Sequence, residues 1–180
     1  MHYNTYHFSK FFNSIKPNLY NDCNESRLQT IFKNKTEKGD ILFFKGVRSQ
    51  NRLFDEIRHL SRMIRLQQMS HESIIFMEGD VGDGMYIVDD GEIKGWVLDR
   101  RSCYRPLKKE LTQGDVFGEI SFFLDSPRTA TLQSKANSRL FFLESRYKKT
   151  LSANCPVLFK RLRKQIYSYE ADDVNLQFKI

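Results

Sequence analysis

The 180-residue sequence contains no apolar run near the roughly 18 residues that a membrane-spanning helix needs. Its opening, MHYNTYHFSK, has neither the apolar core nor the small-residue cleavage site of a signal peptide. The three cysteines, Cys23, Cys103 and Cys155, form no CxxC pair, so the sequence predicts reduced thiols and neither a disulfide framework nor a zinc site. These absences favour a cytoplasmic protein without a transmembrane segment.

The patterns that mark an enzyme are also missing. There is no Ser/His/Asp set, Walker loop or kinase motif, and His2, His7, His59 and His71 share no metal-ligand spacing. We therefore expect no catalytic residues, no metal and no cofactor. Only 11 residues follow Tyr169, which is too few for a helix-turn-helix, so we expect no DNA-binding domain.

What the chain does contain is enough apolar material for one sizeable core. Hydrophobic residues make up 40% and aromatic residues 13% of the sequence. The net charge of +7 is uneven, because residues 146–164 carry seven basic side chains and no acidic one. Such a stretch is compatible with a nucleic-acid or lipid surface, but without a base-reading motif a solvated helix face is favoured.

The stretch 117–131, FGEISFFLDSPRTAT, has the residue types of a phosphate site. Gly118 lets the backbone approach an anion, and the apolar run 120–124 suits a single helical turn whose free N–H groups point toward that anion. Arg128 supplies a permanent charge that pairs with phosphate oxygens, whereas Glu119 can accept a hydrogen bond from a sugar hydroxyl. The spacing predicts a ligand that carries both phosphate and ribose.

FGE, seven residues and PRTAT resemble the phosphate-binding cassette of cyclic-nucleotide-binding domains, as in cAMP- and cGMP-dependent kinases and nucleotide-gated channels. Two upstream stretches extend the resemblance. Residues 75–93 look like the family's "IfxeGdxgdxmYiVxxGxv" run, and Gly114-Asp115 matches the pair that precedes its cassette. The resemblance covers roughly residues 53–167.

The resemblance implies a mainly β fold, an eight-stranded antiparallel jelly-roll barrel with N-terminal helices and two C-terminal helices. It implies cAMP or cGMP as ligand, with a lid formed by the last helix. Thr129 stands where cGMP-responsive members often have threonine and cAMP-selective kinase subunits have alanine. The expected ligand-binding residues are Gly118, Glu119, Ile120, Ser121, Arg128 and Thr129, and the candidate lid residues, at spacings of four and three, are Leu162, Ile166 and Tyr169.

Periodicity and turn residues predict the remaining elements. The expected organisation is an N-terminal extension (1–50), a nucleotide-binding domain (51–169) and a C-terminal tail (170–180). Residues 1–24 are expected to form a tail or an extension packed on a neighbour, and Asp89 to Glu92 a hairpin turn. Expected helices cover 25–32 with Asn24 as cap, 40–46, 51–69, 146–154 and 156–169, and expected strands cover 74–76, 85–88, 93–98, 107–111, 129–133 and 139–143.

The leading functional hypothesis is a non-catalytic cyclic-nucleotide sensor that signals to a protein partner by repacking its C-terminal helices. The alternative is a scaffolding component of a larger assembly with a vestigial or auxiliary pocket. Glu119 and Arg128 favour binding, because degenerate domains of this family usually lose one of the two. The lead-in 27–41 resembles the segment before this domain in protist and flagellar proteins, which adds a ciliary or flagellar location as a possibility.

Overall fold

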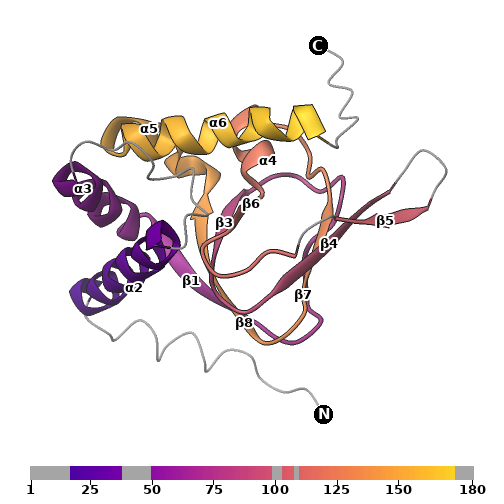
Figure 1. The fold of residues 1–180 in the computed structure, drawn as a ribbon, viewed down its shortest axis with the longest axis horizontal. Coiled ribbons are helices and arrows are strands. Elements are labelled where there is room, and N and C mark those ends of the chain that lie inside the picture. The colour runs from indigo at the N-terminus through magenta and orange to yellow at the C-terminus, as the bar shows by residue number, and fades with distance from the viewer. Residues whose placement is uncertain (1–16, 38–49, 99–102, 108–109, 173–180) are drawn as a thin grey trace.

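The computed structural model describes residues 17–37, 50–98, 103–107 and 110–172 (Figure 1). Two helices, α2 (Pro17–Glu37) and α3 (Gln50–Ser61), precede the strands, and η1 (Ser145–Tyr147), α5 (Lys148–Asn154) and α6 (Pro156–Asp172) follow them. A short helix, α4 (Glu119–Leu124), lies between the sixth and seventh strands. The strands are β1 (Ile64–Met69), β2 (Ile74–Phe76), β3 (Gly84–Asp90), β4 (Ile93–Leu98), β5 (Tyr104–Pro106), β6 (Val116–Phe117), β7 (Thr131–Ser134) and β8 (Ser138–Glu144).

The described strands form two four-stranded sheets with antiparallel pairing throughout. Their orders are β1-β8-β3-β6 and β2-β7-β4-β5, so successive strands alternate between the sheets, except that β4 and β5 pair with each other. That alternation is the connectivity of a double-sheet jelly roll. The expected fold class, mainly β with flanking helices, is confirmed.

Strands β3 and β8 lie in the middle of the first sheet and are buried on both faces. One face of the pair points into the roll and the other points toward the helices, which explains their nearly continuous apolar sequences. The roll core consists of Phe76, Tyr86, Val88, Ile93, Phe117, Leu132, Leu140 and Phe142. The helical core contains Met85, Ile87, Phe141 and Leu143 of these strands, packed with residues of α2, α3, α4, α5 and α6.

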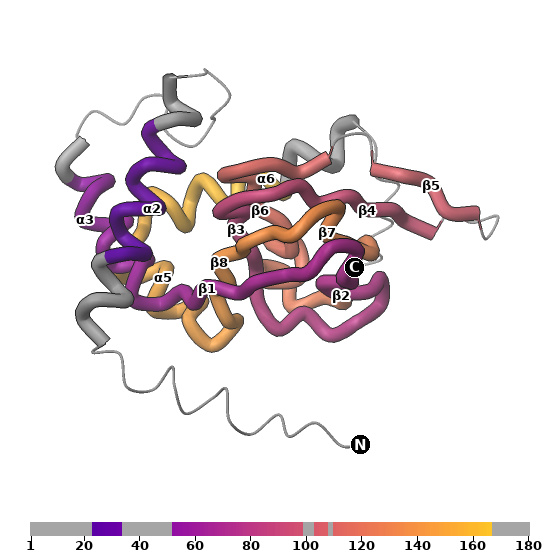
Figure 2. Tube along the Cα trace, turned by 90° about the horizontal axis from the view of Figure 1, so that it is seen from below, coloured from indigo at the N-terminus to yellow at the C-terminus, as the bar shows by residue number. Residues whose placement is uncertain are grey.

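Two groups of helices pack against the first sheet, α2 with α3 and α5 with α6. Both ribbon and tube views place α2 and α3 at one end of the molecule and the β4–β5 hairpin at the other (Figures 1 and 2). Helix α6 runs over the roll beside α4, with which it packs. The site region around α4 is therefore adjacent to the C-terminal helices.

Polar side chains fasten the helices to one another and to the roll. Arg27 of α2 pairs with the buried Asp89 at the end of β3, and Arg139 Nε donates to the same carboxylate at 2.9 Å. On the other side, Glu56 of α3 accepts the backbone N–H groups of Val157 at 3.1 Å and Leu158 at 2.9 Å. Glu56 thus caps the first turn of α6 from a different helix.

The expected helix over 51–69 is wrong in its second half. Helix α3 ends at Ser61, and residues 64–69 form β1, which pairs with β8 from Ile64 opposite Leu143 to Met69 opposite Ser138. The intervals of three and four carry through to Ile64, but pairing along a whole strand of the roll overrides that periodicity.

The N-terminal expectations are corrected in extent. Helix α2 starts at Pro17, inside the expected tail, and continues to Glu37, beyond the expected 25–32. Asn24 is not a cap, because it lies within α2 and is buried. The expected helix over 40–46, and residues 1–16 of the expected tail, lie outside the described residues.

Two expectations for the strands fail as well. The strand expected at 107–111 is not found in its described residues: Leu107 follows β5 (Tyr104–Pro106), Leu111 forms only an isolated bridge to Ile93, and residues 108–109 lie outside the described residues. The turn at 89–92 exists, with Gly91 at φ 101°, but β3 and β4 belong to different sheets, so it is a corner of the roll and not a hairpin. The strands expected at 74–76, 85–88, 93–98, 129–133 and 139–143, and both C-terminal helices, are confirmed, with ends shifted by no more than three residues.

Candidate functional site

The expected phosphate-binding stretch forms a compact loop and helix at the mouth of the roll. Strand β6 ends at Phe117, Gly118 turns the chain in a left-handed conformation (φ 75°), and α4 begins at Glu119. A Cβ on Gly118 would lie 2.5 Å from Arg128 Nη1, so the position requires glycine for both its dihedral angle and its space. The sequence expectation of one helical turn here is confirmed.

Arg128 is 2% exposed and forms the centre of this site. Its Nη1 donates to the backbone oxygens of Gly84 at 2.8 Å and Gly118 at 3.1 Å, and its Nη2 donates to Asp83 Oδ1 at 2.7 Å. The guanidinium lies over the ring of Phe76, with 4.1 Å from Cζ to the ring centroid. A permanent cation is therefore fixed in an apolar setting with contacts on its edges and on one face.

Two buried polar atoms of the site lack a hydrogen bond. Within the described part of the chain, Arg128 Nε and Ser126 Oγ are buried and have no hydrogen-bond partner. A buried donor without an acceptor costs about 1–3 kcal/mol, more when it is charged. Both atoms belong to the same loop, and an anionic ligand with several acceptor oxygens fits that pair.

The other expected ligand-binding residues are brought to the same loop. Glu119, 3% exposed, is the first residue of α4, and Ile120, half-buried, follows it. Ser121 is buried and its hydroxyl donates to the backbone oxygen of Pro127 at 3.2 Å, which ties the helix to the segment before Arg128. Thr129 is half-buried directly after Arg128.

Two of the three candidate lid residues pack inside the molecule. Leu162 and Ile166 are buried on the inner side of α6 and belong to the helical core. Tyr169 lies within α6, but its side chain is outside the described residues. They share that core with Phe122 and Phe123 of α4, and their role as a lid over a base stays a prediction.

The α4 loop is nevertheless in direct contact with the C-terminal helices. The rings of Phe123 and Phe159 meet edge to face at 5.1 Å between α4 and α6. At the same, C-terminal end of α4, Lys148 Nζ of α5 donates to Phe123 O at 3.0 Å and to Asp125 Oδ2 at 2.8 Å. A displacement of α4 would therefore change its contacts with α5 and α6.

Sequence reasoning left three contributors without a role. Asp83, Gly84 O and the Phe76 ring all contact Arg128, although Asp83 and Phe76 stand within the stretch that carries the resemblance. The Gly82-Asp83 pair was the available signal: a Cβ on Gly82 would lie 2.4 Å from Ser121 Cβ, so this turn packs directly against α4. The ring contact carries no sequence signal, because it depends on how the two sheets face each other.

Tyr86 adds an aromatic wall to the same region. Burial, reinforced by Asp83 and opposed by Arg128, raises the pKa of Tyr86 to about 12. The phenol therefore stays neutral at physiological pH, and Tyr86 stacks on Phe117 at 5.0 Å. Its ring lies 5.8 Å from Arg128 Cζ, farther than that of Phe76.

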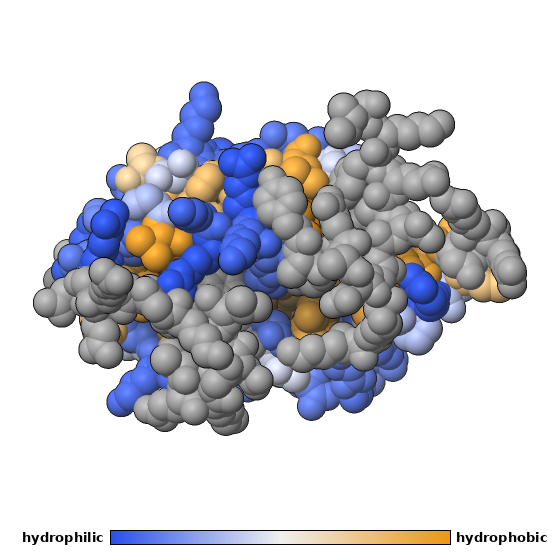
Figure 3. Space-filling view, turned by 45° about the horizontal axis from the view of Figure 1, so that its top comes forward, coloured by the Kyte–Doolittle hydropathy of each residue, from blue (hydrophilic) through white to orange (hydrophobic). Residues whose placement is uncertain are grey.

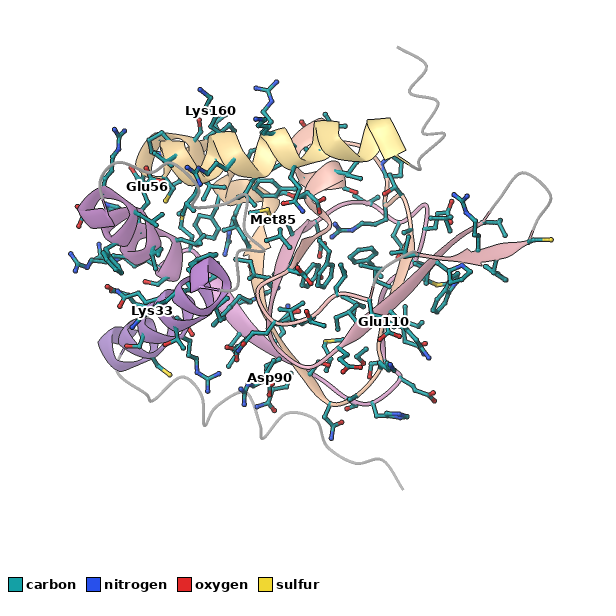
Figure 4. All side chains as sticks on the ribbon, in the orientation of Figure 1. Lys33, Glu56, Met85, Asp90, Glu110 and Lys160 are labelled. Carbon is teal, nitrogen blue, oxygen red and sulfur yellow. The ribbon has the colours of Figure 1, made fainter. Side chains whose placement is uncertain are left out.

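The basic side chains of 146–164 differ in their surroundings: some form ion pairs with carboxylates, and at least one points outward. Arg146 pairs with Glu144 at 2.8 Å and Lys148 with Asp125, while Lys160 points outward from α6, away from the roll (Figure 4). In the space-filling view, hydrophilic residues occupy much of the described surface on the side that carries α6 (Figure 3). This arrangement agrees with a solvated helix face.

Comparison with known families decides the assignment of this architecture. Residues 66–154, which run from within β1 through β8 and include α4, match the family model described as the cyclic nucleotide-binding domain. This part of the chain belongs to that family.

Curated relatives of the cyclic nucleotide-binding domain come from different kinds of protein. The chain is 34% identical over 65 residues to the cAMP-dependent protein kinase regulatory subunit of Blastocladiella emersonii, covering 34% of this chain and 15% of the relative. It is 20% identical over 122 residues to a putative potassium channel protein of Rhodopseudomonas palustris, covering 68% and 29%. The match therefore spans less than a third of each relative.

Solved structures agree on the fold. The regulatory domain of Toxoplasma gondii cAMP-dependent protein kinase with cAMP matches with a TM-score of 0.66 at 20% identity, covering 84% of this chain and 51% of that one. A cyclic nucleotide-binding domain from Methylobacillus flagellatus matches with a TM-score of 0.58 at 20% identity, covering 65% and 67%. Among the described residues, no helix is both long and apolar enough to cross a membrane.

Proposed function

We propose that this domain is a non-catalytic sensor that binds cAMP or cGMP in the α4 loop. The phosphate pairs with Arg128, and Glu119 accepts a hydrogen bond from the ribose 2′-hydroxyl. Backbone groups of Gly118, Ile120 and Ser121 complete the cradle, and Thr129 faces the purine. These roles follow the family resemblance residue by residue.

The observation that carries the proposal is the unpaired Nε of a 2% exposed guanidinium. The fold encloses a charge without offering every donor an acceptor, and a phosphate supplies the missing acceptor together with a compensating charge. Ser126 Oγ, unpaired among the described residues as well, provides a second donor in the same loop.

The output we propose is a change in how α5 and α6 pack. Ligand binding at the loop shifts α4, and the Phe123–Phe159 contact and the Lys148 bonds pass that shift to the C-terminal helices. A ligand that binds one packing more tightly than another shifts the population toward it. A protein partner that recognises one arrangement of α6 would then read the signal.

Calorimetric titration of the whole chain with cAMP and with cGMP tests the binding step. We expect saturable binding of at least one nucleotide by the wild type and strongly weakened binding by Arg128→Lys, because an ammonium cannot reproduce a paired guanidinium contact. Arg139→Lys is the control, since Arg139 is another arginine paired with a carboxylate, that of Asp89, and has no role in the proposed site. Equal affinity in wild type and Arg128→Lys would contradict the pocket assignment.

One observation favours the second candidate, a scaffolding module with an unused pocket. Three protein acceptors already satisfy both Nη atoms of Arg128, so the guanidinium also serves as a strut between β3 and the α4 loop. A wild-type protein that binds neither nucleotide, while Arg128→Lys lowers the free energy of unfolding, would support this scaffold function.

A further inference from the structure

The Arg128 guanidinium is held by contacts of two kinds, hydrogen bonds and an aromatic ring. Its edges are held by Gly84 O, Gly118 O and Asp83, all of which come from β3, the turn before it or the start of α4. These in-plane bonds fix where the group lies but resist tilting of its plane only weakly. A second kind of contact is needed to hold the plane.

Phe76 provides that contact from the opposite sheet. It is the last residue of β2, pairs with Leu132 of β7, and is buried. Its ring centroid lies 4.1 Å from Arg128 Cζ, well within the roughly 6 Å over which a cation and an aromatic face attract. Arg128 is therefore held between an acceptor set on one sheet and an aromatic face on the other.

The ring itself is fixed by its neighbours. Its centroid lies 6.0 Å from those of both Tyr86 and Phe117, at tilted angles. The stacked pair of Tyr86 and Phe117 in turn packs in the roll core. The ring is therefore a rigid platform for the cation it carries.

We propose that Phe76 is a positioning residue for the anion. Its ring holds the guanidinium plane so that Nε faces the bound phosphate, and it excludes water from one side of the ion pair. Resting on the proposed nucleotide binding, this role acts in two ways. An arginine held in place pays less conformational entropy on binding, and a dry face strengthens the attraction between opposite charges.

Ring fluorination tests the contact without changing the shape of the side chain. Phe76 is replaced by 4-fluoro-, 3,5-difluoro- and 3,4,5-trifluorophenylalanine, and each protein is titrated with cAMP and cGMP. Fluorine withdraws electron density from the ring face, so we expect affinity to fall stepwise, by roughly tenfold across the series. The same series at Phe142 is the matched control, because that ring also packs on Tyr86 in the roll core but lies under Arg65.

A second measurement follows Arg128 without any nucleotide. In nitrogen-proton spectra of the free protein, the Nε–H signal of Arg128 should carry a ring-current shift, and Phe76→Leu should remove that shift and speed its exchange with water. A retained shift, or equal affinities across the Phe76 series while the wild type binds, would overturn the inference and leave the proposed function intact. A wild type that binds neither nucleotide would overturn both.

Discussion

Two buried ionic centres lie on opposite sides of the first sheet, and they differ in how completely the protein satisfies them. At the mouth of the roll, Arg128 pairs with Asp83, whose side chain is 67% exposed, and keeps one donor unpaired among the described residues. Among the helices, Glu56 is 3% exposed and both of its carboxylate oxygens accept N–H groups of α6. The first centre is incomplete and open to one side, whereas the second is closed.

The difference indicates different purposes. A buried polar group with all its partners stabilises one arrangement of the chain, and the cost of enclosing it is met within the protein. A buried cation with an unpaired donor is stabilised when another molecule supplies the missing acceptor. We therefore expect changes at Arg128 to act mainly on ligand binding, and changes at Glu56 to act mainly on the stability and packing of α6.

The largest expected effect is on nucleotide affinity at Arg128. Arg128→Lys should weaken binding by about 3 kcal/mol, because it removes the paired, charge-assisted contact with the phosphate. Urea unfolding with and without 1 mM nucleotide measures this through the stabilisation that a ligand gives its binding-competent state. The wild type should gain stability on addition of nucleotide, and the variant should gain little. If nucleotide stabilises the variant as much as the wild type, Arg128 does not act mainly on ligand binding.

Glu56→Ala should have the next largest effect, and on stability. Removing the carboxylate leaves the N–H groups of Val157 and Leu158 without their acceptors, and we expect a loss of about 2–3 kcal/mol in the free energy of unfolding. Asp55→Asn, on the same helix but exposed, is the matched control and should change the stability by less than about 0.5 kcal/mol. Amide hydrogen exchange should show faster opening at 157 and 158 in the first variant alone.

An effect of similar or smaller size is expected at Glu119, where sugar chemistry is the readout. Glu119→Ala should weaken cAMP or cGMP by about 1.5–3 kcal/mol but their 2′-deoxy analogues much less, because the carboxylate and the hydroxyl share one charge-assisted hydrogen bond. Affinities of the four protein–ligand combinations form a double cycle. Additive losses would mean that Glu119 supports the fold at the start of α4 and does not contact the sugar.

The sequence predicted the local structure of the loop 117–131 well and the helical lead-in poorly, for a physical reason. The loop 117–131 depends on local requirements, such as glycine at a positive φ and an arginine nine residues after a glutamate. These residue types and their spacing can be recognised in the sequence. The boundary at 61–64 depends on pairing with β8, about 80 residues later, which no local periodicity encodes. A stretch with apolar residues at helical spacing therefore became half helix and half strand.

Contacts across the two sheets were equally hidden. The sequence did not predict the contact of the Phe76 ring with Arg128, because these residues are 52 positions apart. Nor did it predict the contact of Glu56 with the start of α6, 101 positions away. The same applies to the corner at 89–92, where a good turn signal says that the chain reverses but not which sheet receives it. Local chemistry is readable from sequence, whereas partners in space are not.

A smaller effect, on selectivity, is expected at Thr129. A syn guanine would bring its amino group near this hydroxyl, and one extra hydrogen bond favours cGMP by about 1 kcal/mol. Thr129→Ala should therefore lower the ratio of cGMP to cAMP affinity about fivefold. Thr129→Ser, which keeps the hydroxyl, should preserve the ratio. If alanine leaves the ratio unchanged, the threonine serves only the strand that begins at Thr131, and the phosphate and ribose assignments are unaffected.

The smallest effect belongs to the closed centre and appears only at alkaline pH. Cys155 is buried beside Glu56, to whose backbone oxygen its Sγ donates at 3.2 Å, and burial, reinforced by the Glu56 charge, raises the pKa of this thiol to about 12 from an ordinary value of 9.0. The folded protein therefore holds the thiol proton over a range in which the unfolded chain releases it. Its contribution to stability is complete below about pH 9 and is lost as pH rises toward 12.

The measurement is the difference in unfolding free energy between the wild type and Cys155→Ala, determined by urea titration from pH 7 to pH 10. Lost packing gives the variant a constant offset, whereas the proton gives the wild type an additional loss that stays under about 1 kcal/mol at pH 9 and grows toward pH 10. Tyr86 titrates in both proteins, so its contribution cancels. A difference that stays constant over the whole range would mean that the thiol is more open to water than the closed packing around Glu56 implies.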